Sequence, residues 1–316
     1  MNRRGCLWAL AAGIAVSLLL LSFVGGFVAG RAIGTFADVA GAFGDAVAVI
    51  YVTGTIQSGE AGGGLGIDGN TYSGTVVRQL KQAQSDPSVK AVVLRVDSPG
   101  GSAEGSDEIY NALVQTRKRG KPVVASMGAL AASGGYYVSA AADRILANRN
   151  TLTGSIGVIT ILPNMQELLS KLGVRTYVFK SGAYKDTGTG LRPLTDEEQQ
   201  IWQSLIDDAY RRFVQVVAEG RGMDEARVRQ LADGRLYSAQ QAKDSGLIDD
   251  FGDLDDAVEL AAQLGGIRGK PRLVEYRRRS LIGSLFSRVL APQELSLERL
   301  TGLPRHRTLQ YLHVEP

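Results

Sequence analysis

Apolar residues recur along this chain in two patterns, short β-branched runs and longer stretches with helical spacing. The runs predict strands, because Val, Ile and Leu at this density suit a buried sheet. The predicted strands are residues 46–53, 91–96, 122–126, 144–147, 156–160, 174–179 and 272–276. The predicted helices are residues 71–84, 106–118, 165–172, 224–231, 238–244 and 254–264. Strands alternate with helices through the first two-thirds of the chain, which predicts an α/β fold with a largely parallel sheet.

One further helix is long and has a clear start. Thr195 and Glu198 have the spacing of a capping box, in which each side chain binds the other residue's backbone N–H. The helix is predicted to run to about residue 219. Its predicted buried stripe is Ile201, Trp202, Leu205, Ala209, Phe213 and Val217.

Residues 7–30 form an apolar stretch of 24 residues without a charge. As a helix it would span roughly 36 Å, enough for a hydrocarbon core of about 30 Å. A cleaved signal peptide and a retained anchor are both possible readings. The stretch is longer than an ordinary signal sequence and lacks a clear cleavage box, which favours the anchor. Arg3 and Arg4 precede it, so we expect a cytoplasmic N-terminus and a body outside the cytoplasm.

The expected organisation has four parts: a cytoplasmic tip and anchor at 1–31, a linker at 32–45, a main domain at 46–290 and a tail at 291–316. The glycine-rich stretch 58–70 is predicted to be a loop. Arg3, Arg4 and Arg31 account for the whole net charge of +3, so residues 32–316 are neutral and give no sign of nucleic-acid binding.

Cysteine and histidine usage excludes several kinds of catalytic site. The only cysteine, Cys6, precedes the apolar stretch, where a thiol at the membrane edge is favoured over a lipid attachment site. The only histidines, His306 and His313, lie in the last eleven residues. A cysteine nucleophile, a Ser-His-Asp triad and a histidine zinc site are therefore not expected in the main domain.

Three features at the ends of predicted strands offer an alternative chemistry. Ser133 lies on a strand-to-helix turn between small residues, Lys185 follows a later strand, and Gly100 and Gly101 follow an earlier one. Sites in open α/β sheets collect at the carboxyl ends of strands. Ser133 could attack a carbonyl, Lys185 could take its proton, and backbone N–H groups of Gly100, Gly101 or Gly134 could hold the oxyanion. The plainer interpretation is a tight turn whose glycines permit unusual backbone angles.

A lysine base imposes a demand on its surroundings. The ordinary lysine pKa is about 10.4, and a base near neutrality needs roughly 7–8, which burial can provide because desolvation disfavours the ammonium. Ser155 is the candidate hydroxyl that orients the amine. Taken singly, a lysine here is a surface residue and Ser155 a turn residue. Asp97 is a turn former rather than a catalytic acid, and Tyr136 and Tyr137 are packing residues.

Four segments together resemble the signal peptide peptidase A family in its short, single-domain form. They are 97–102 (Asp-Ser-Pro-Gly-Gly-Ser), 131–137 (Ala-Ala-Ser-Gly-Gly-Tyr-Tyr), 152–157 (Leu-Thr-Gly-Ser-Ile-Gly) and 181–186 (Ser-Gly-Ala-Tyr-Lys-Asp). The resemblance covers about residues 46–266 and implies a Clp protease/crotonase-like fold. It implies a Ser133–Lys185 dyad with Ser155 orienting the lysine, an oxyanion contribution from the 100–101 turn, and no metal or cofactor. It also implies dome-like homo-oligomers with shared sites, which degrade remnant signal peptides in the membrane.

We therefore expect a membrane-anchored serine endopeptidase that cleaves extended apolar peptides through an acyl-enzyme. Its partners would be such peptides, the lipid bilayer and further copies of the chain, without nucleic acid. One alternative is a crotonase-like acyl-CoA enzyme, which extracytoplasmic placement disfavours. Another is a catalytically silent membrane scaffold, which the presence of both Ser133 and Lys185 disfavours.

Overall fold

A parallel sheet forms the centre of the folded unit. The computed structural model describes residues 44–60, 69–276 and 310–312, and the compact unit begins at Ala46. The sheet has the order β10-β7-β6-β4-β1-β11, and every neighbouring pair is parallel. Its strands are β1 (Ala46–Thr53), β4 (Val89–Ser98), β6 (Val123–Ala132), β7 (Arg144–Ala147), β10 (Asp250–Phe251) and β11 (Arg272–Glu275).

Strand β6 is longer than its neighbour β7 and therefore has two partners along one edge. β7 pairs with its first half, and β8 (Leu152–Gly154) pairs with its last residues in parallel. Strand β9 (Leu236–Ser238) then pairs antiparallel with β8. This branch extends β6 to Ala132, so that the strand ends directly before Ser133.

A smaller sheet has the order β12-β5-β2-β3. Its strands are β2 (Ile56–Gln57), β3 (Thr71–Tyr72), β5 (Gly100–Ser102) and β12 (Gln310–Leu312). Strand β5 pairs in parallel with β2 and antiparallel with β12. The glycine pair predicted to hold an oxyanion is therefore part of a short strand rather than a free turn.

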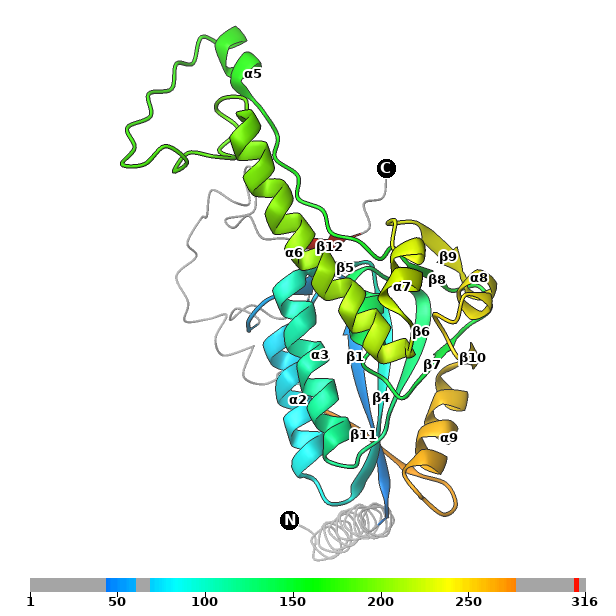
Figure 1. Ribbon diagram of the computed structural model, residues 1–316. Helices are drawn as coiled ribbons and strands as arrows, with labels where there is room; N and C mark the ends of the chain where they lie inside the picture. The colour runs from blue at the N-terminus through cyan, green and yellow to red at the C-terminus, as the bar shows by residue number, and fades with distance from the viewer. Residues whose placement is uncertain (1–43, 61–68, 277–309, 313–316) are drawn as a thin grey trace, which may run out of the picture. The chain divides into compact units, whose positions relative to one another are not determined.

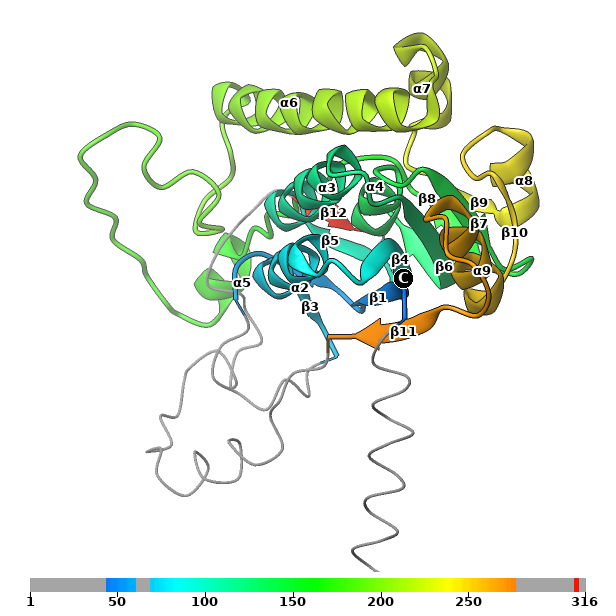
Figure 2. The ribbon, with the colours of Figure 1, turned by 90° about the horizontal axis from the view of Figure 1, so that it is seen from below.

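Alternate side chains of β1 pack against different helices on the two faces of the central sheet. Ala48, Ile50 and Val52 join a core with residues of α2 (Ser73–Ser85), α3 (Ala103–Lys118), α4 (Gly134–Ser139) and α6 (Asp196–Arg221). Val47 and Val49 face α9 (Leu254–Leu264). Figures 1 and 2 show α2, α3, α4 and α6 on one side of the sheet and α9 on the other.

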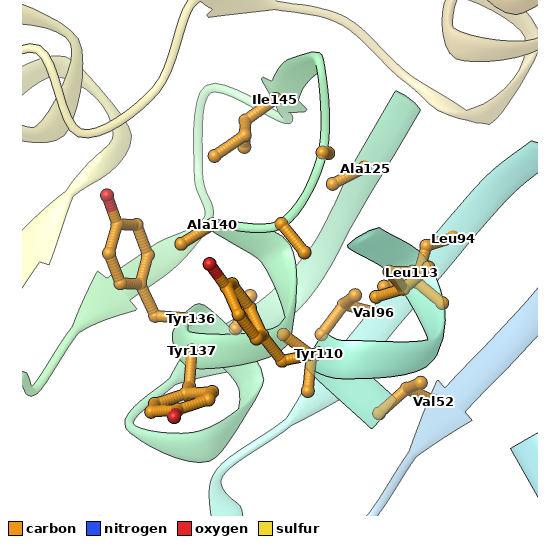
Figure 3. Close-up of a cluster of buried hydrophobic side chains, with 14 of the residues drawn as sticks. Val52, Leu94, Val96, Tyr110, Leu113, Ala125, Tyr136, Tyr137, Ala140 and Ile145 are labelled. Atoms are coloured by element: carbon orange, nitrogen blue, oxygen red, sulfur yellow. The ribbon is translucent and has the colours of Figure 1, made fainter. Parts of the chain in front are cut away.

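The larger core is continuous from the sheet to the helices. Figure 3 shows Leu94 and Val96 of β4 beside Leu113 and Tyr110 of α3, with Tyr137 of α4 nearby. Tyr110 and Tyr137 make an edge-to-face contact with ring centroids 5.5 Å apart. Burial of these large side chains supplies most of the stabilisation, at about 25 cal/mol per Å² of apolar surface. This close packing holds β4, β6 and α4 rigidly in place.

Local signals placed most helices correctly. The predicted capping box is present at Thr195 and Glu198, and α6 ends at Gly222 in the left-handed region with φ 62°. The predictions of α5 (Gln166–Lys171), α7 (Glu225–Leu231) and α8 (Ala239–Asp244) are also confirmed. Strand β11 and helix α9 form where the sequence predicted them.

Two predicted strands and part of a predicted stripe are wrong. Residues 156–160 contain only an isolated bridge, and residues 174–179 have no regular structure. β-Branched residues favour a strand, but a strand also needs a neighbouring strand for its N–H and C=O groups. Among the described residues neither segment has one, although the carbonyl of Ile156 accepts from the N–H of Gly234 at 3.2 Å. In α6, Phe213 and Val217 are buried, whereas Ile201 and Leu205 are exposed. No described element covers the first half of this helix.

Several predicted features lie outside the described residues. They are the apolar stretch 7–30, most of the linker, part of the loop 58–70, and most of the tail. Cys6, His306 and His313 also lie there. Within residues 44–60, 69–276 and 310–312, no helix combines the length and apolar character that a membrane span needs.

Candidate active site

Ser133 and Ser155 share an unusual backbone conformation. Their φ angles are 52° and 49°, and they are the only non-glycine residues in the described part of the chain with positive φ. Such a conformation costs on the order of 1–3 kcal/mol and persists only where surrounding structure imposes it. The sequence predicts both as site residues. Strain stored at two candidate site residues is typical of a functional site.

Strand pairing places these two serines side by side. Ala132 at the end of β6 pairs with Gly154 at the end of β8, and each strand is followed directly by its strained serine. The N–H of Ser133 donates to the carbonyl of Gly154 at 2.8 Å. The N–H of Ser155 donates to the carbonyl of Arg235, also at 2.8 Å. The structure therefore brings the predicted nucleophile and the predicted orienting hydroxyl together.

The hydroxyl of Ser133 is buried and has no hydrogen-bond partner among the described residues. The residue is only 1% exposed. A buried polar group without a partner costs about 1–3 kcal/mol. Ser133 is the N-cap residue of α4, and its carbonyl accepts from the N–H of Tyr137 at 2.8 Å. The backbone of Ser133 is therefore hydrogen-bonded, while its side chain is not. The hydroxyl is thus available to an incoming group.

The three glycines predicted to hold an oxyanion surround this serine. A Cβ on Gly134 would lie 2.5 Å from Ser106 Oγ and 3.2 Å from Gly100 Cα. A Cβ on Gly101 would lie 2.1 Å from the carbonyl oxygen of Ile56. Glycine is therefore required at Gly101 by the close approach of the β2 backbone, and at Gly134 a side chain would collide with Ser106.

The N–H groups of these glycines differ in their availability. The N–H of Gly100 donates to Ser98 Oγ at 3.1 Å and is already engaged. Gly134 is the first residue of α4, so its N–H has no acceptor within the helix. Of Gly100 and Gly134, Gly134 is the better placed to bind an oxyanion beside Ser133.

Lys185 lies apart from Ser133 within one chain. Its side chain is exposed, in a series of turns between α5 and α6. It makes no hydrogen bond to Ser133, whose hydroxyl is unpartnered. Figure 1 shows α5 and the connection to α6 extending beyond the helices that cover the sheet. The structure therefore assembles Ser133, Ser155 and the glycines but leaves the predicted base outside this group.

Other residues considered in the sequence have structural roles. Asp97 accepts a hydrogen bond from the N–H of Leu130 at 3.0 Å and ties β4 to β6. Tyr136 and Tyr137 are fully buried packing residues, as predicted. The hydroxyl of Tyr136 donates to the carbonyl of Leu247 at 2.8 Å, and burial raises its pKa well above the ordinary value.

Sequence reasoning missed an ionic cluster next to Lys185. Arg192 bridges the carboxylates of Asp186 and Glu198, both of which are buried. Hydrogen bonds from Arg192 and Lys180 hold the pKa of Asp186 far below its usual range. Bonds from Arg192 and the N–H of Thr195 lower the pKa of Glu198 to about 2. The only signal in the sequence was the capping box. It predicts the contact between Glu198 and Thr195, but not the contact between Glu198 and Arg192.

The edge of β5 accepts an extended chain. Strand β12 pairs antiparallel with it, with Tyr311 opposite Gly101 and Leu312 opposite Gly100.

A separate cavity of about 710 Å³ lies between α9 and β11, lined in part by Val258, Ile267 and Leu273. None of the predicted site residues lines that cavity.

Family comparisons support the predicted fold and family. A family model described as Clp protease matches residues 66–159, and with the parallel sheet it defines a Clp protease-like α/β fold, as predicted. The model of peptidase family S49 matches residues 115–268. A putative protease of Synechocystis, slr0021, is 43% identical over 221 residues, which are 70% of this chain and 75% of that protein. The chain belongs to peptidase family S49.

Two further relatives confirm the resemblance drawn from the four segments. The putative signal peptide peptidase SppA of Enterococcus faecium is 45% identical, over 57% of this chain and 53% of that protein. Protease 4 of Haemophilus influenzae is 37% identical over 82% of this chain. The chain spans only 42% of the length of that Protease 4.

Proposed function

We propose that this chain is a serine endopeptidase with Ser133 as nucleophile and Lys185 as base. The observation that carries the proposal is the Ser133 hydroxyl, held buried, unpartnered and strained beside Gly100 and Gly134. A strand-to-helix turn of this kind presents a nucleophile at the end of a sheet. Membership of a peptidase family supports the same assignment.

The proposed reaction has two stages. Ser133 Oγ attacks the peptide carbonyl while the neutral amine of Lys185 takes its proton, and the N–H of Gly134 stabilises the oxyanion. Lys185 then gives the proton to the leaving amine, which leaves an acyl-enzyme. Water attacks the ester with Lys185 again as base, releasing the acid and restoring Ser133. Ser155, strained and adjacent to Ser133, is the proposed acceptor that orients the lysine.

We further propose that the lysine comes from a neighbouring copy of the chain. Lys185 makes no hydrogen bond to Ser133 in its own chain, and the segment around it exposes large apolar side chains. Their exposed fractions are 64% for Ile161, 68% for Leu172, 79% for Tyr177 and 95% for Phe179. A monomer rarely leaves so many such side chains in water, which supports a homo-oligomer with shared sites.

The proposed substrates are extended apolar peptides, including remnant signal peptides. Pairing of β12 with β5 supports main-chain recognition, because an extended substrate can add to a sheet edge in this way. The printed name of the Enterococcus faecium relative supports signal peptides. Residues 7–30 are the proposed membrane anchor, with the N-terminus in the cytoplasm and the catalytic domain outside it.

Peptidase assays on the full chain in detergent test the dyad. We expect cleavage of a fluorogenic peptide with a small or aliphatic residue before the scissile bond. Ser133→Ala and Lys185→Ala should each abolish it, as should Lys185→Arg, because arginine keeps its proton. Lys171→Ala, which alters an exposed lysine of α5, is the matched control and should keep full rate. Normal turnover by the Ser133→Ala protein would exclude the proposed nucleophile.

A labelling experiment tests the topology. Cys6 is the only cysteine of the chain, so a membrane-impermeant maleimide added to intact cells should leave this chain unlabelled. With Gln240→Cys, an exposed position on α8, the same reagent should label the chain from outside. Labelling of Cys6 but not of the α8 cysteine would reverse the proposed orientation.

A further inference from the structure

We infer that Arg192 is a positioning residue that fixes the loop carrying Lys185. The inference rests on the proposed role of Lys185 as base, because a fixed loop matters to the reaction only if that amine transfers a proton. Residues 187–194 join Lys185 and Asp186 to the start of α6 and contain no regular helix or strand.

Asp186 is the first anchor point, one residue from Lys185. Its Oδ1 accepts from Arg192 Nη2 at 2.7 Å and from Lys180 Nζ at 2.8 Å. Its Oδ2 accepts from Arg192 Nε at 2.9 Å. Arg192 therefore grips this carboxylate with two parallel bonds, the strongest geometry for such a pair. The Cα atoms of Lys185 and Asp186 are separated by one peptide unit, about 3.8 Å. Fixing the position of Asp186 therefore also restrains the backbone of Lys185.

Glu198 is the second anchor point and belongs to a rigid element. Its Oε2 accepts from Arg192 Nη1 at 2.7 Å, and its Oε1 accepts from Arg192 Nη2 at 2.6 Å. Its Oε2 also accepts from the N–H of Thr195 at 3.0 Å, while Thr195 Oγ1 caps the N–H of Glu198 at 3.2 Å. The guanidinium thus ties the lysine loop to the first turn of a helix of 26 residues.

Charge, rather than apolar packing, holds this part of the chain. Within residues 160–200, the buried residues are Asp186, Gly188, Gly190 and Glu198. Helix α5 buries no residue. Two buried carboxylates need compensating cations. Among the described residues, Arg192 is the one side chain that bonds to both, so its removal should release the loop while leaving the hydrophobic core intact.

Kinetics on the full chain in detergent test the inference with a fluorogenic peptide. A displacement of about 1 Å at a reacting group can cost roughly 100-fold in rate. Arg192→Gln should therefore lower kcat about 100-fold and change KM less than about twofold. Arg192→Lys keeps a cation but cannot bridge two carboxylates in parallel, so its kcat should be intermediate. Full rate in either variant would overturn the positioning role.

Thr195→Ala is the matched control, because it removes the helix cap and keeps every bond to Arg192. Its backbone N–H can still reach Glu198, and kcat should stay within about twofold of the unmodified chain. An equal loss of kcat in Thr195→Ala and Arg192→Gln would show that any loosening of the α6 start is sufficient. That result would overturn a specific role for Arg192.

Hydrogen exchange separates this inference from the proposed function. Amides of residues 182–191 should exchange faster in Arg192→Gln than in Thr195→Ala, whatever the chain's activity. If the unmodified chain cleaves no peptide but this exchange difference is present, the proposed function fails and the anchoring of the loop stands. Unchanged exchange in Arg192→Gln would overturn the inference even in an active peptidase.

Discussion

Ser133 carries two energetic costs in the folded chain, a positive φ of 52° and a buried hydroxyl without a partner. Each costs on the order of 1–3 kcal/mol, and neither contributes to the stability of the fold. The hydrogen bonds that impose them come from backbone groups of β8 and α4. The strain is therefore maintained by a rigid surrounding structure, which is the expected relation between stability and activity at a reactive group.

Ser133→Ala should leave the free energy of unfolding unchanged or raise it by about 1 kcal/mol. Alanine keeps the strained backbone but removes the unpartnered hydroxyl. Ser139→Ala in the same helix is the control, since Ser139 Oγ donates to the carbonyl of Gly135 at 2.8 Å and its loss should cost about 1 kcal/mol. Urea denaturation measures both. A clear loss of stability in Ser133→Ala would indicate a structural partner for this hydroxyl.

The ionic cluster at Arg192 should make stability depend on acid pH. The pKa of Glu198 is lowered to about 2 and that of Asp186 lies still lower, first because of hydrogen bonds from Arg192. A lowered pKa stabilises the folded state above the unfolded pKa, about 4, and this contribution disappears as pH falls through the folded value. The stability difference between the unmodified chain and Arg192→Gln should thus be constant from pH 7 to 5 and shrink toward pH 2. Urea titrations at pH 7, 5 and 3 measure it; a difference that does not change with pH would contradict this account.

Among the elements, the short strand β5 has a strict steric requirement at Gly101. Gly101 has φ 150° and approaches the backbone of β2 so closely that no Cβ fits. By contrast, Gly120 has φ 77° and open space around it. Both positions favour glycine by conformation, but only at Gly101 would a side chain displace a neighbouring strand.

Gly101→Ala should therefore lower the free energy of unfolding by about 3 kcal/mol or more and abolish peptide cleavage. Gly120→Ala should cost only about 1 kcal/mol, from the positive φ alone, and leave activity unchanged. Thermal unfolding followed by circular dichroism gives both values. Similar costs at the two sites would mean that β2 moves aside easily.

Element prediction succeeded where the signal was local and failed where a partner was needed. The capping box of α6 consists of contacts within one turn, and it formed as predicted. Residues 174–179 have strand composition but no neighbouring strand among the described residues. Ile201 and Leu205 in the first half of α6 are likewise exposed, although they belong to its predicted buried stripe. Composition records the propensity for a structure, whereas a strand or a buried face depends on a second segment of chain.

For the whole molecule, the separation of Ser133 from Lys185 is the main consequence of the fold. Ser133 directly follows strand β6 of the central sheet, whereas Lys185 lies on an exposed segment with apolar side chains such as Phe179. One folded chain therefore carries both parts of the proposed site without joining them.

Mixing two inactive variants tests whether neighbouring copies join these parts. Ser133→Ala and Lys185→Ala proteins should each be inactive alone, and co-assembly should restore part of the activity, because some sites then combine an intact serine with an intact lysine. Equal amounts refolded or co-expressed together provide the sample, and peptide cleavage is the readout. Activity that stays at the background level in co-assembled oligomers would place the base in the same chain as its nucleophile.

The sequence by itself determined most of the helices, the strands β1, β4, β6, β7 and β11, the family, and the serines and glycines that meet at the end of β6, because these follow from local patterns and motifs. Only the tertiary structure decided that Ser133 is unpartnered, that the N–H of Gly100 is engaged, and that Arg192 joins Asp186 to Glu198. It also decided that Lys185 lies outside the site of its own chain. The reason is physical: burial, close approach and hydrogen-bond pairing depend on which distant segments become neighbours, and that information is absent from any short stretch of sequence.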